Sequence, residues 1–176
     1  MKILKNTSVH IANAMVEHWA DQGMHPVSCA DYVYLYKDGF FNKIKNLHGY
    51  IMGECEGLKI GDDKSLGLSW TSTVQIARAI LAHRDIYSED FFDSAPTGIG
   101  VSEGFFVPGV AKPSLRAHSP GNRLRVSYGD ALDFAEPTAF FGFLDEVFGG
   151  DVDALDKRSV IMELLGCALS GVEISR

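Results

Sequence analysis

Five basic or imidazole side chains lie close together in the sequence and are its best candidates for binding a ligand. Within fourteen consecutive positions the chain carries Lys112, Arg116, His118, Arg123 and Arg125. An arginine can make two parallel hydrogen bonds to one phosphate group, so three arginines in one segment suit a nucleic-acid backbone. Phe106 and Tyr128 lie nearby in the sequence and would stack on bases if they are exposed. These residues predict a DNA-contacting segment.

The alternative is that these arginines neutralise the acidic C-terminal part of the same chain. Residues 131–176 contain nine acidic and three basic residues, whereas residues 101–130 contain four basic and two acidic ones. The net charge of −7 also disfavours binding to a polyanion. In this interpretation the partners are acidic side chains of the last two helices, namely Asp145, Glu146, Asp151 and Asp153. The sequence leaves both interpretations open.

The metal-binding side chains of the sequence do not have the spacing of a metal site. Four potential zinc ligands are spread along the first third of the chain: His25, Cys29, His48 and Cys55. They lack the short Cys-x2-Cys or His-x3-His pair that structural zinc sites use. The three cysteines are widely spaced, which is typical of free thiols in a reducing compartment. We therefore expect no metal ion.

The sequence also lacks the motifs of nucleotide hydrolysis and nucleophilic catalysis. The glycine-containing runs at residues 57–67 and 97–100 do not end in the Gly-Lys-Ser/Thr that binds nucleotide phosphates. There is no Gly-x-Ser-x-Gly elbow for a nucleophilic serine. Paired carboxylates at residues 62–63 and 145–146 fit solvated surfaces. We expect no catalytic residue and no cofactor.

An aromatic hairpin is the clearest element of the first half. Aromatic and β-branched residues alternate over Tyr32–Lys37, and Asp38-Gly39 separates this run from a second one at residues 40–44. The aromatic side chains are either a stacking platform for bases or hairpin core that packs against the helix expected after residue 70. Apolar residues at helical spacing predict helices at residues 7–22, 46–55 and 71–87, with a polar loop at residues 59–67.

The second half begins with short strands and ends with two helices. Residues 99–101 and 105–107 flank Ser102-Glu103-Gly104 and predict a second hairpin, and residues 123–127 predict a strand with its arginines facing solvent. A helix at residues 137–148 should end at Gly149-Gly150, with a left-handed glycine as its C-cap. A further helix runs to Gly171, with Asp151 as its N-cap.

Taken together, the elements predict an α+β fold: an N-terminal helix, a β-hairpin, central helices, small antiparallel strands and a C-terminal helix pair. We expect a single domain over residues 1–176, in which residues 94–172 resemble a known family and residues 1–93 match it more loosely. Hydrophobic content of 46% and charged content of 22% are ordinary for a soluble globular chain. No apolar run approaches the roughly 20 residues that span a bilayer, and no signal peptide is recognisable. We therefore expect a cytoplasmic protein that does not bind membranes.

The C-terminal runs FLDEVFGGD and ELLGCALSG resemble the region that precedes the ATPase module in primase–helicases of phages, plasmids and poxviruses. That family joins a primase to a ring-forming superfamily-three helicase. The resemblance extends upstream through the runs IGVSEGFFV and LRAHSPGNRLRV and covers about residues 99–171.

The resemblance implies a pre-helicase domain, a linker or collar that positions the ATPase ring during DNA replication and contacts DNA. In the family a strand and a Gly-Lys-Ser/Thr loop follow this region, whereas this chain stops at Arg176. We therefore expect this chain to be no enzyme, although its parent protein would be an ATP-dependent helicase–primase. The expected partners are single-stranded or forked DNA, the ATPase module in cis or in trans, and further copies of the chain.

The alternative from a different functional class is a stand-alone structural or protein-interaction module. An exposed apolar strip on the last helix pair would then bind a partner protein or another copy of the chain. Such a module would not bind nucleic acid.

Overall fold

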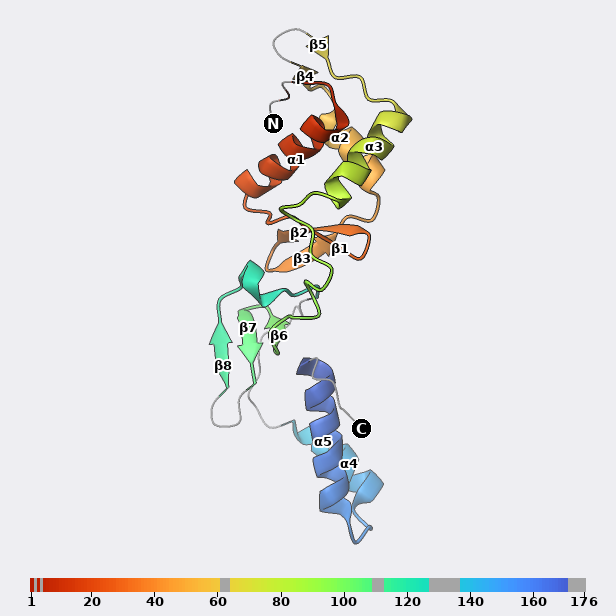
Figure 1. Ribbon diagram of the computed structural model, residues 1–176. Helices are drawn as coiled ribbons and strands as arrows, with labels where there is room; N and C mark the ends of the chain where they lie inside the picture. Colours follow the sequence, from red (N-terminus) through yellow and green to blue (C-terminus); the bar gives the residue numbers. More distant parts are fainter. Residues whose placement is uncertain (2, 4, 61–63, 109–112, 127–136, 171–176) are drawn as a thin grey trace. The chain divides into compact units, whose positions relative to one another are not determined.

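The computed structural model describes residues 1, 3, 5–60, 64–108, 113–126 and 137–170 (Figure 1). The fold is α+β, as the sequence predicts. The chain forms two compact units, each described by itself: Met1–Ala95 with Ser119–Val126, and Pro96–His118 with Ser127–Arg176. The chain therefore leaves the first unit after residue 95 and returns to it for eight residues. The single domain expected over residues 1–176 stays a prediction.

Three helices and a three-stranded antiparallel sheet build most of the first unit. The sheet order is β1-β2-β3, and the β2–β3 hairpin has the predicted turn, with Asp38 at φ 56° and Gly39 at φ 93°. Each helix begins at a polar cap: Thr7, Asn46 and Ser69 accept hydrogen bonds from backbone N–H groups of the first turn. The bounds are α1 Ser8–Asp21, β1 Val27–Cys29, β2 Tyr32–Lys37, β3 Phe40–Lys43, α2 Leu47–Cys55 and α3 Trp70–Leu81.

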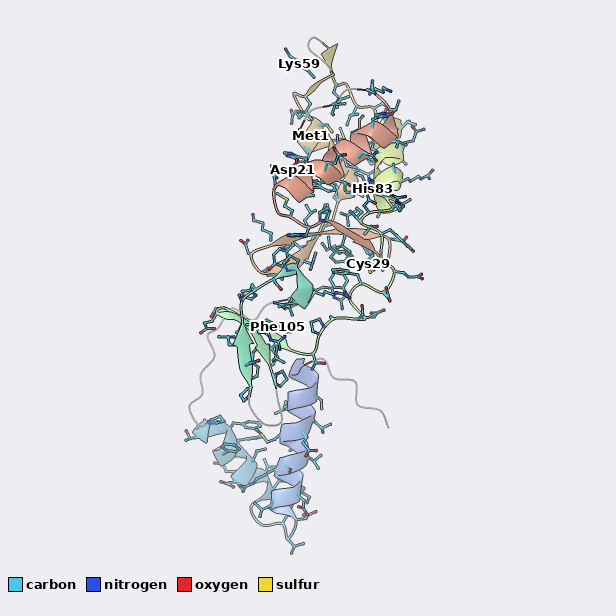
Figure 2. All side chains as sticks on the ribbon, turned by 60° about the vertical axis from the view of Figure 1, so that its left-hand side comes forward. Met1, Asp21, Cys29, Lys59, His83 and Phe105 are labelled. Carbon is cyan, nitrogen blue, oxygen red and sulfur yellow. The ribbon has the colours of Figure 1, made fainter. Side chains whose placement is uncertain are left out.

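The two faces of this sheet are buried by different parts of the chain. Val33 and Leu35 pack with the apolar faces of α1, α2 and α3 in one core cluster, which includes the buried Trp19. On the opposite face, Tyr34 and Phe41 pack with Phe91 and Phe92. Side chains fill the space between α1 and α3 (Figure 2). In this view Asp21 marks the end of α1, and His83 lies just beyond the end of α3. Tyr34 and Tyr36 are hairpin core, and Phe91 and Phe92 pack against them in place of α3, whereas Tyr32 is exposed.

The helix predicted to reach residue 87 ends earlier, and the predicted polar loop contains strands. After Leu81 the chain turns, and the backbone of Ser28 bonds to Ile86 and Ser88 beside β1. The gain of these sheet-edge hydrogen bonds explains why the helix does not continue. The presumed loop contains the short antiparallel pair β4 Lys59–Ile60 and β5 Lys64–Ser65, next to the buried Leu66.

The returning segment of residues 119–126 is not the strand that its alternating sequence predicts. Pro120–Asn122 forms a 3-10 turn, η1, and Arg123 follows it in the left-handed conformation with φ 52°. Beside this segment, the N–H of Phe41 in β3 donates to the carbonyl of Leu124 over 2.6 Å. The segment is therefore tied to the edge strand of the sheet by a backbone hydrogen bond. Residue 127, the last of the predicted strand, lies outside the described residues.

The second unit contains the second predicted hairpin and the predicted helix pair. A three-stranded sheet has the order β6-β7-β8, and Val101 pairs with Gly104 across the tight turn. Gly149 closes the first helix in a right-handed conformation at φ −60°, so the predicted left-handed cap is wrong. The bounds are β6 Ile99–Val101, β7 Gly104–Val107, β8 Ser114–Arg116, α4 Thr138–Phe148 and α5 Ala154–Ser170.

We expect Gly104→Ala to destabilise the second unit by about 2 kcal/mol or more. The added Cβ would collide with the backbone carbonyl of Arg116, and Phe105 pairs with Arg116 in the same ladder. Gly142→Ala is the control, because a Cβ on that face of α4 meets nothing within 4 Å. The control should stabilise α4 by about 0.5–1 kcal/mol. Urea unfolding followed by far-UV circular dichroism measures both, and equal stabilities of the two variants would contradict the described strand pairing.

Candidate nucleic-acid interface

The five residues predicted to contact DNA do not form one described cluster. Arg123 and Arg125 belong to the first unit, whereas Arg116 and His118 belong to the second. Lys112 lies outside the described residues. Their proximity in sequence is therefore not by itself an indication of a common surface, and each residue is described by its own contacts.

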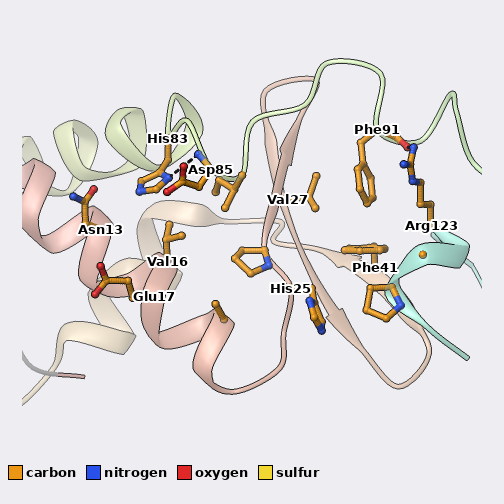
Figure 3. A pocket seen from close by; sticks show the side chains of 15 residues that line it. Asn13, Val16, Glu17, His25, Val27, Phe41, His83, Asp85, Phe91 and Arg123 are labelled. Atoms are coloured by element: carbon orange, nitrogen blue, oxygen red, sulfur yellow. Dashed lines mark hydrogen bonds between the residues drawn. The ribbon is translucent and has the colours of Figure 1, made fainter.

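Arg123 is a structural side chain. Its Nη1 donates to the carbonyl oxygens of Phe91 at 3.0 Å and Ser94 at 3.4 Å, and it also bonds to the hydroxyl of Ser94. The guanidinium lies over the Phe91 ring, 4.8 Å from its centroid (Figure 3). These contacts fasten the segment that covers the aromatic face of the sheet. The prediction that Arg123 faces solvent is therefore wrong, because the side chain is half-buried and its Nη1 group is bonded to these protein oxygens.

His118 also has a structural contact, while Arg116 is exposed. The Nε2 atom of His118 lies 2.8 Å from the carbonyl oxygen of Val101 and must carry the proton, since a carbonyl only accepts. This bond holds the residue that follows β8 to the end of β6. Arg116 is an exposed residue of β8. Of these two residues, only Arg116 presents its charge to solvent.

Arg125 differs from Arg123 although only one residue separates them. Its side chain is exposed and lies over the Phe92 ring, 5.1 Å from the centroid. It lines a groove of about 470 Å³ together with Lys43 and Lys45 from the end of β3. Tyr34 and Phe41 form the apolar part of the same lining. A solvent-exposed guanidinium beside two lysines is suited to phosphate.

This groove adjoins two others, because Lys45 lines all three. The second groove, of about 490 Å³, adds Lys37, and the third, of about 400 Å³, adds Arg78 and His48. Asp31 is the one acidic residue in the linings of these three grooves. None of the five cations forms an ion pair with a carboxylate among the residues that the structure describes. We call this set the basic surface: Lys37, Lys43, Lys45, Arg78 and Arg125.

Arg125 is the one residue of the basic surface that the sequence predicted as a DNA contact. The other four residues were not predicted. One local signal was present, since Lys43 and Lys45 alternate with Ile44, and Ile44 packs against the helical core. Alternation of that kind points both lysines away from the core. No comparable signal marks Arg78, which α3 supplies from more than thirty positions further along the chain.

A larger pocket of about 610 Å³ lies in the same unit and has a mixed lining. Figure 3 shows His83 and Asp85 toward one end and Arg123 with Phe41 toward the other. The ring Nδ1 of His83 accepts a hydrogen bond from the backbone N–H of Asp85 at 3.3 Å. Among the described residues, no three His, Cys, Asp or Glu side chains gather to hold a metal ion. The pocket offers no arrangement of a nucleophile with a neighbouring base.

The four side chains considered as zinc ligands have separate surroundings. Burial, followed by the charge of Glu54, raises the pKa of Cys55 to about 11, so its thiol stays protonated at neutral pH. Cys29 is buried, and its thiol donates to the carbonyl of Glu89 over 3.3 Å. The remaining two make aromatic contacts: His48 with Trp70, and His25 with Tyr36.

The acidic residues of the helix pair find partners within that pair. Lys157 bonds to Asp151 at 2.6 Å and to Asp153 at 2.9 Å, and Arg158 of α5 pairs with Asp145 of α4. The hydrogen bonds that Lys157 donates to Asp151 and Asp153 raise the pKa of Lys157, and the bond to Asp153 lowers the pKa of that carboxyl. Three of the four carboxylates proposed as partners for the arginines are therefore already paired by cations of α5.

A scan against protein-family models found no family that matches this chain, and a search of curated proteins found no matching relative. In the described part of the chain, no helix combines the length and apolar character needed to cross a membrane.

Arg123→Ala and Arg125→Ala should separate the structural arginine from the surface arginine. Arg123→Ala leaves the carbonyls of Phe91 and Ser94 without their donor and should destabilise the first unit by about 1–3 kcal/mol. Arg125→Ala loses an exposed cation–aromatic contact and should cost no more than about 0.5–1 kcal/mol. Urea unfolding followed by tryptophan fluorescence measures this, because Trp19 and Trp70 both lie in the first unit. A larger loss for Arg125→Ala would contradict these assignments.

Proposed function

We propose that this chain is an accessory, pre-helicase domain of a mobile-element DNA primase–helicase, and that it contacts DNA through the basic surface of its first unit. The observation that carries the proposal is the grouping of five cations around adjoining grooves of a chain whose net charge is −7. The parentage rests on the sequence resemblance of residues 99–171. The basic surface lies outside that stretch except for Arg125. The resemblance and the basic surface therefore support the proposal largely independently.

Local charge matters more than net charge for this kind of binding. Salt screens charges beyond a Debye length of about 8 Å, so a phosphate on the grooves responds mainly to the nearest cations. Those cations have no carboxylate partner among the described residues and lose no ion pair when a phosphate arrives. Binding would release counterions from DNA, which makes the affinity depend steeply on salt.

The C-terminal helix pair supports the collar part of the proposal. Large apolar side chains of α5 are exposed, with Leu155 at 77% and Val160 at 53%. Three carboxylates of the pair are bonded to Lys157 or Arg158, whereas the large apolar side chains of α5 remain exposed in the described structure. An ATPase module that packs on α5 would remove this surface from water and would gain hydrophobic free energy. In this role the chain positions the ATPase, and the ATPase hydrolyses the nucleotide.

Fluorescence anisotropy with labelled single-stranded and forked DNA tests the DNA contact. The variant Lys43→Ala/Lys45→Ala/Arg125→Ala should bind about tenfold or more weakly at low salt. The slope of log affinity against log salt should fall by about 0.7 for each lost contact to a single strand.

The matched control for that experiment is Lys5→Ala/Lys59→Ala/Arg84→Ala. These three residues are exposed cations of the same unit and do not line the three grooves. The control changes the net charge equally and should leave the affinity within about twofold. Equal losses for the two variants would mean that the attraction is diffuse, and unaltered binding by both would overturn the assignment of the site.

The exposed apolar side chains of α5 favour a second candidate function. In this function the chain is an interaction module that associates with itself and does not bind nucleic acid. A second copy would bury the same α5 side chains that an ATPase module would otherwise cover. This candidate needs neither the basic surface nor a nucleotide-hydrolysing partner.

Sedimentation velocity over a range of protein concentrations tests self-association. The second candidate requires concentration-dependent oligomers, and Leu155→Glu/Val160→Glu should shift them to monomer because charges would enter an apolar interface. The control is Val9→Glu, which changes an exposed apolar residue of α1. A chain that stays monomeric throughout and binds DNA would contradict the second candidate.

A further inference from the structure

We propose that the basic surface binds single-stranded DNA and that Trp70 stacks on an unpaired base. This inference rests on the proposed function and adds the form of DNA to it. The inference depends on the side chain of Trp70, which carries no charge and which the proposed function does not require.

Trp70 is the most exposed aromatic side chain of the first unit. It is the first residue of α3 and is 65% exposed, whereas the other tryptophan, Trp19, is 1% exposed in the helical core. Leaving an indole in water forgoes the free energy of burying a large apolar surface. An indole of this kind next to cations is typical of proteins that bind single strands.

His48 connects Trp70 to the basic surface. Its imidazole lies 5.1 Å from the Trp70 ring, centroid to centroid, with 31° between the two planes. His48 also lines the groove of about 400 Å³ that contains Lys45 and Arg78. This tilted contact places the indole beside a residue that lines the groove. A base on Trp70 would therefore leave its phosphates within the reach of the groove lysine and arginine.

Tyr32 provides an exposed ring in the lining of the groove to which His48 belongs. Its side chain is 44% exposed, and the Lys43 ammonium lies 3.0 Å from the ring centroid. The groove thus presents rings and cations side by side, which suits the alternation of bases and phosphates along a strand. On the covered face of the sheet, Tyr34 is 7% exposed and Phe41 is 2% exposed, so these rings offer little surface to a base.

This arrangement should favour single-stranded over duplex DNA, because a paired base is not accessible to a stacking side chain. In a duplex the faces of each base are covered by neighbouring base pairs, and exposing one costs unstacking and unpairing energy. A single strand offers its bases without that cost. The lysines and arginines attract both forms, so the preference for the single strand should depend on Trp70.

Three DNA ligands of equal length test the inference: oligo(dT), the same backbone with abasic sites, and a duplex. Trp70→Ala should weaken oligo(dT) binding by about tenfold and leave the abasic and duplex affinities within about twofold. Trp70→Phe should recover most of the loss because it keeps a stacking ring. Oligo(dT) should also quench the tryptophan fluorescence of the unaltered chain, and Trp70→Ala should abolish this quenching.

The outcomes separate this inference from the proposed function. If Trp70→Ala binds all three ligands like the unaltered chain, or weakens all three equally, stacking by Trp70 is wrong and the phosphate-binding surface stands. If the unaltered chain binds none of the three ligands at low salt, the proposed DNA contact fails and this inference fails with it. Far-UV circular dichroism of Trp70→Ala checks that the first unit remains folded in both cases.

Discussion

The burial of the aromatic face of the first sheet is the constraint on which the rest of the first unit depends. Three helices cover one face of the sheet, and Phe91 with Phe92 covers the other. Phe41 lies 5.1 Å from the Phe91 ring and 5.8 Å from the Phe92 ring, with the planes nearly perpendicular. A sheet buried on both faces leaves charged residues only at its edge and ends. This is why the lysines around the end of β3 lie together in solvent.

Arg123 and Arg125 give one returning segment both a structural contact and a place in the proposed binding surface. The Phe41–Leu124 backbone hydrogen bond aligns the segment with β3, and a side chain of the segment contacts each covering phenylalanine. Arg123 bonds to backbone carbonyls and is withdrawn from solvent, whereas Arg125 keeps its guanidinium exposed beside the lysines. The segment that fastens the aromatic core is therefore also the one that completes the basic surface.

The helix pair of the second unit differs from the first unit in the kind of surface that it exposes. Its charges are paired locally, by Lys157 with two aspartates and by Arg158 with Asp145, while large apolar side chains of α5 remain exposed. Surface ion pairs of this kind contribute little stability, so they define the local geometry more than they hold the fold. The first unit thus presents charge to its surroundings and the helix pair presents apolar surface, which is compatible with two partners of different chemistry.

The sequence by itself determined the features that depend on neighbouring residues. The Asp38-Gly39 turn, the polar caps of α1, α2 and α3 and the tight turn after Val101 follow from local backbone chemistry, whereas α5 begins three residues after the predicted cap Asp151. Only the tertiary structure decided that Arg123 is half-buried and bonded to backbone carbonyls, that α3 stops at Leu81, and that Lys37, Arg78 and Arg125 line grooves that share Lys45. These outcomes depend on contacts between residues tens of positions apart, and the alternation or periodicity of a short segment carries no information about such contacts.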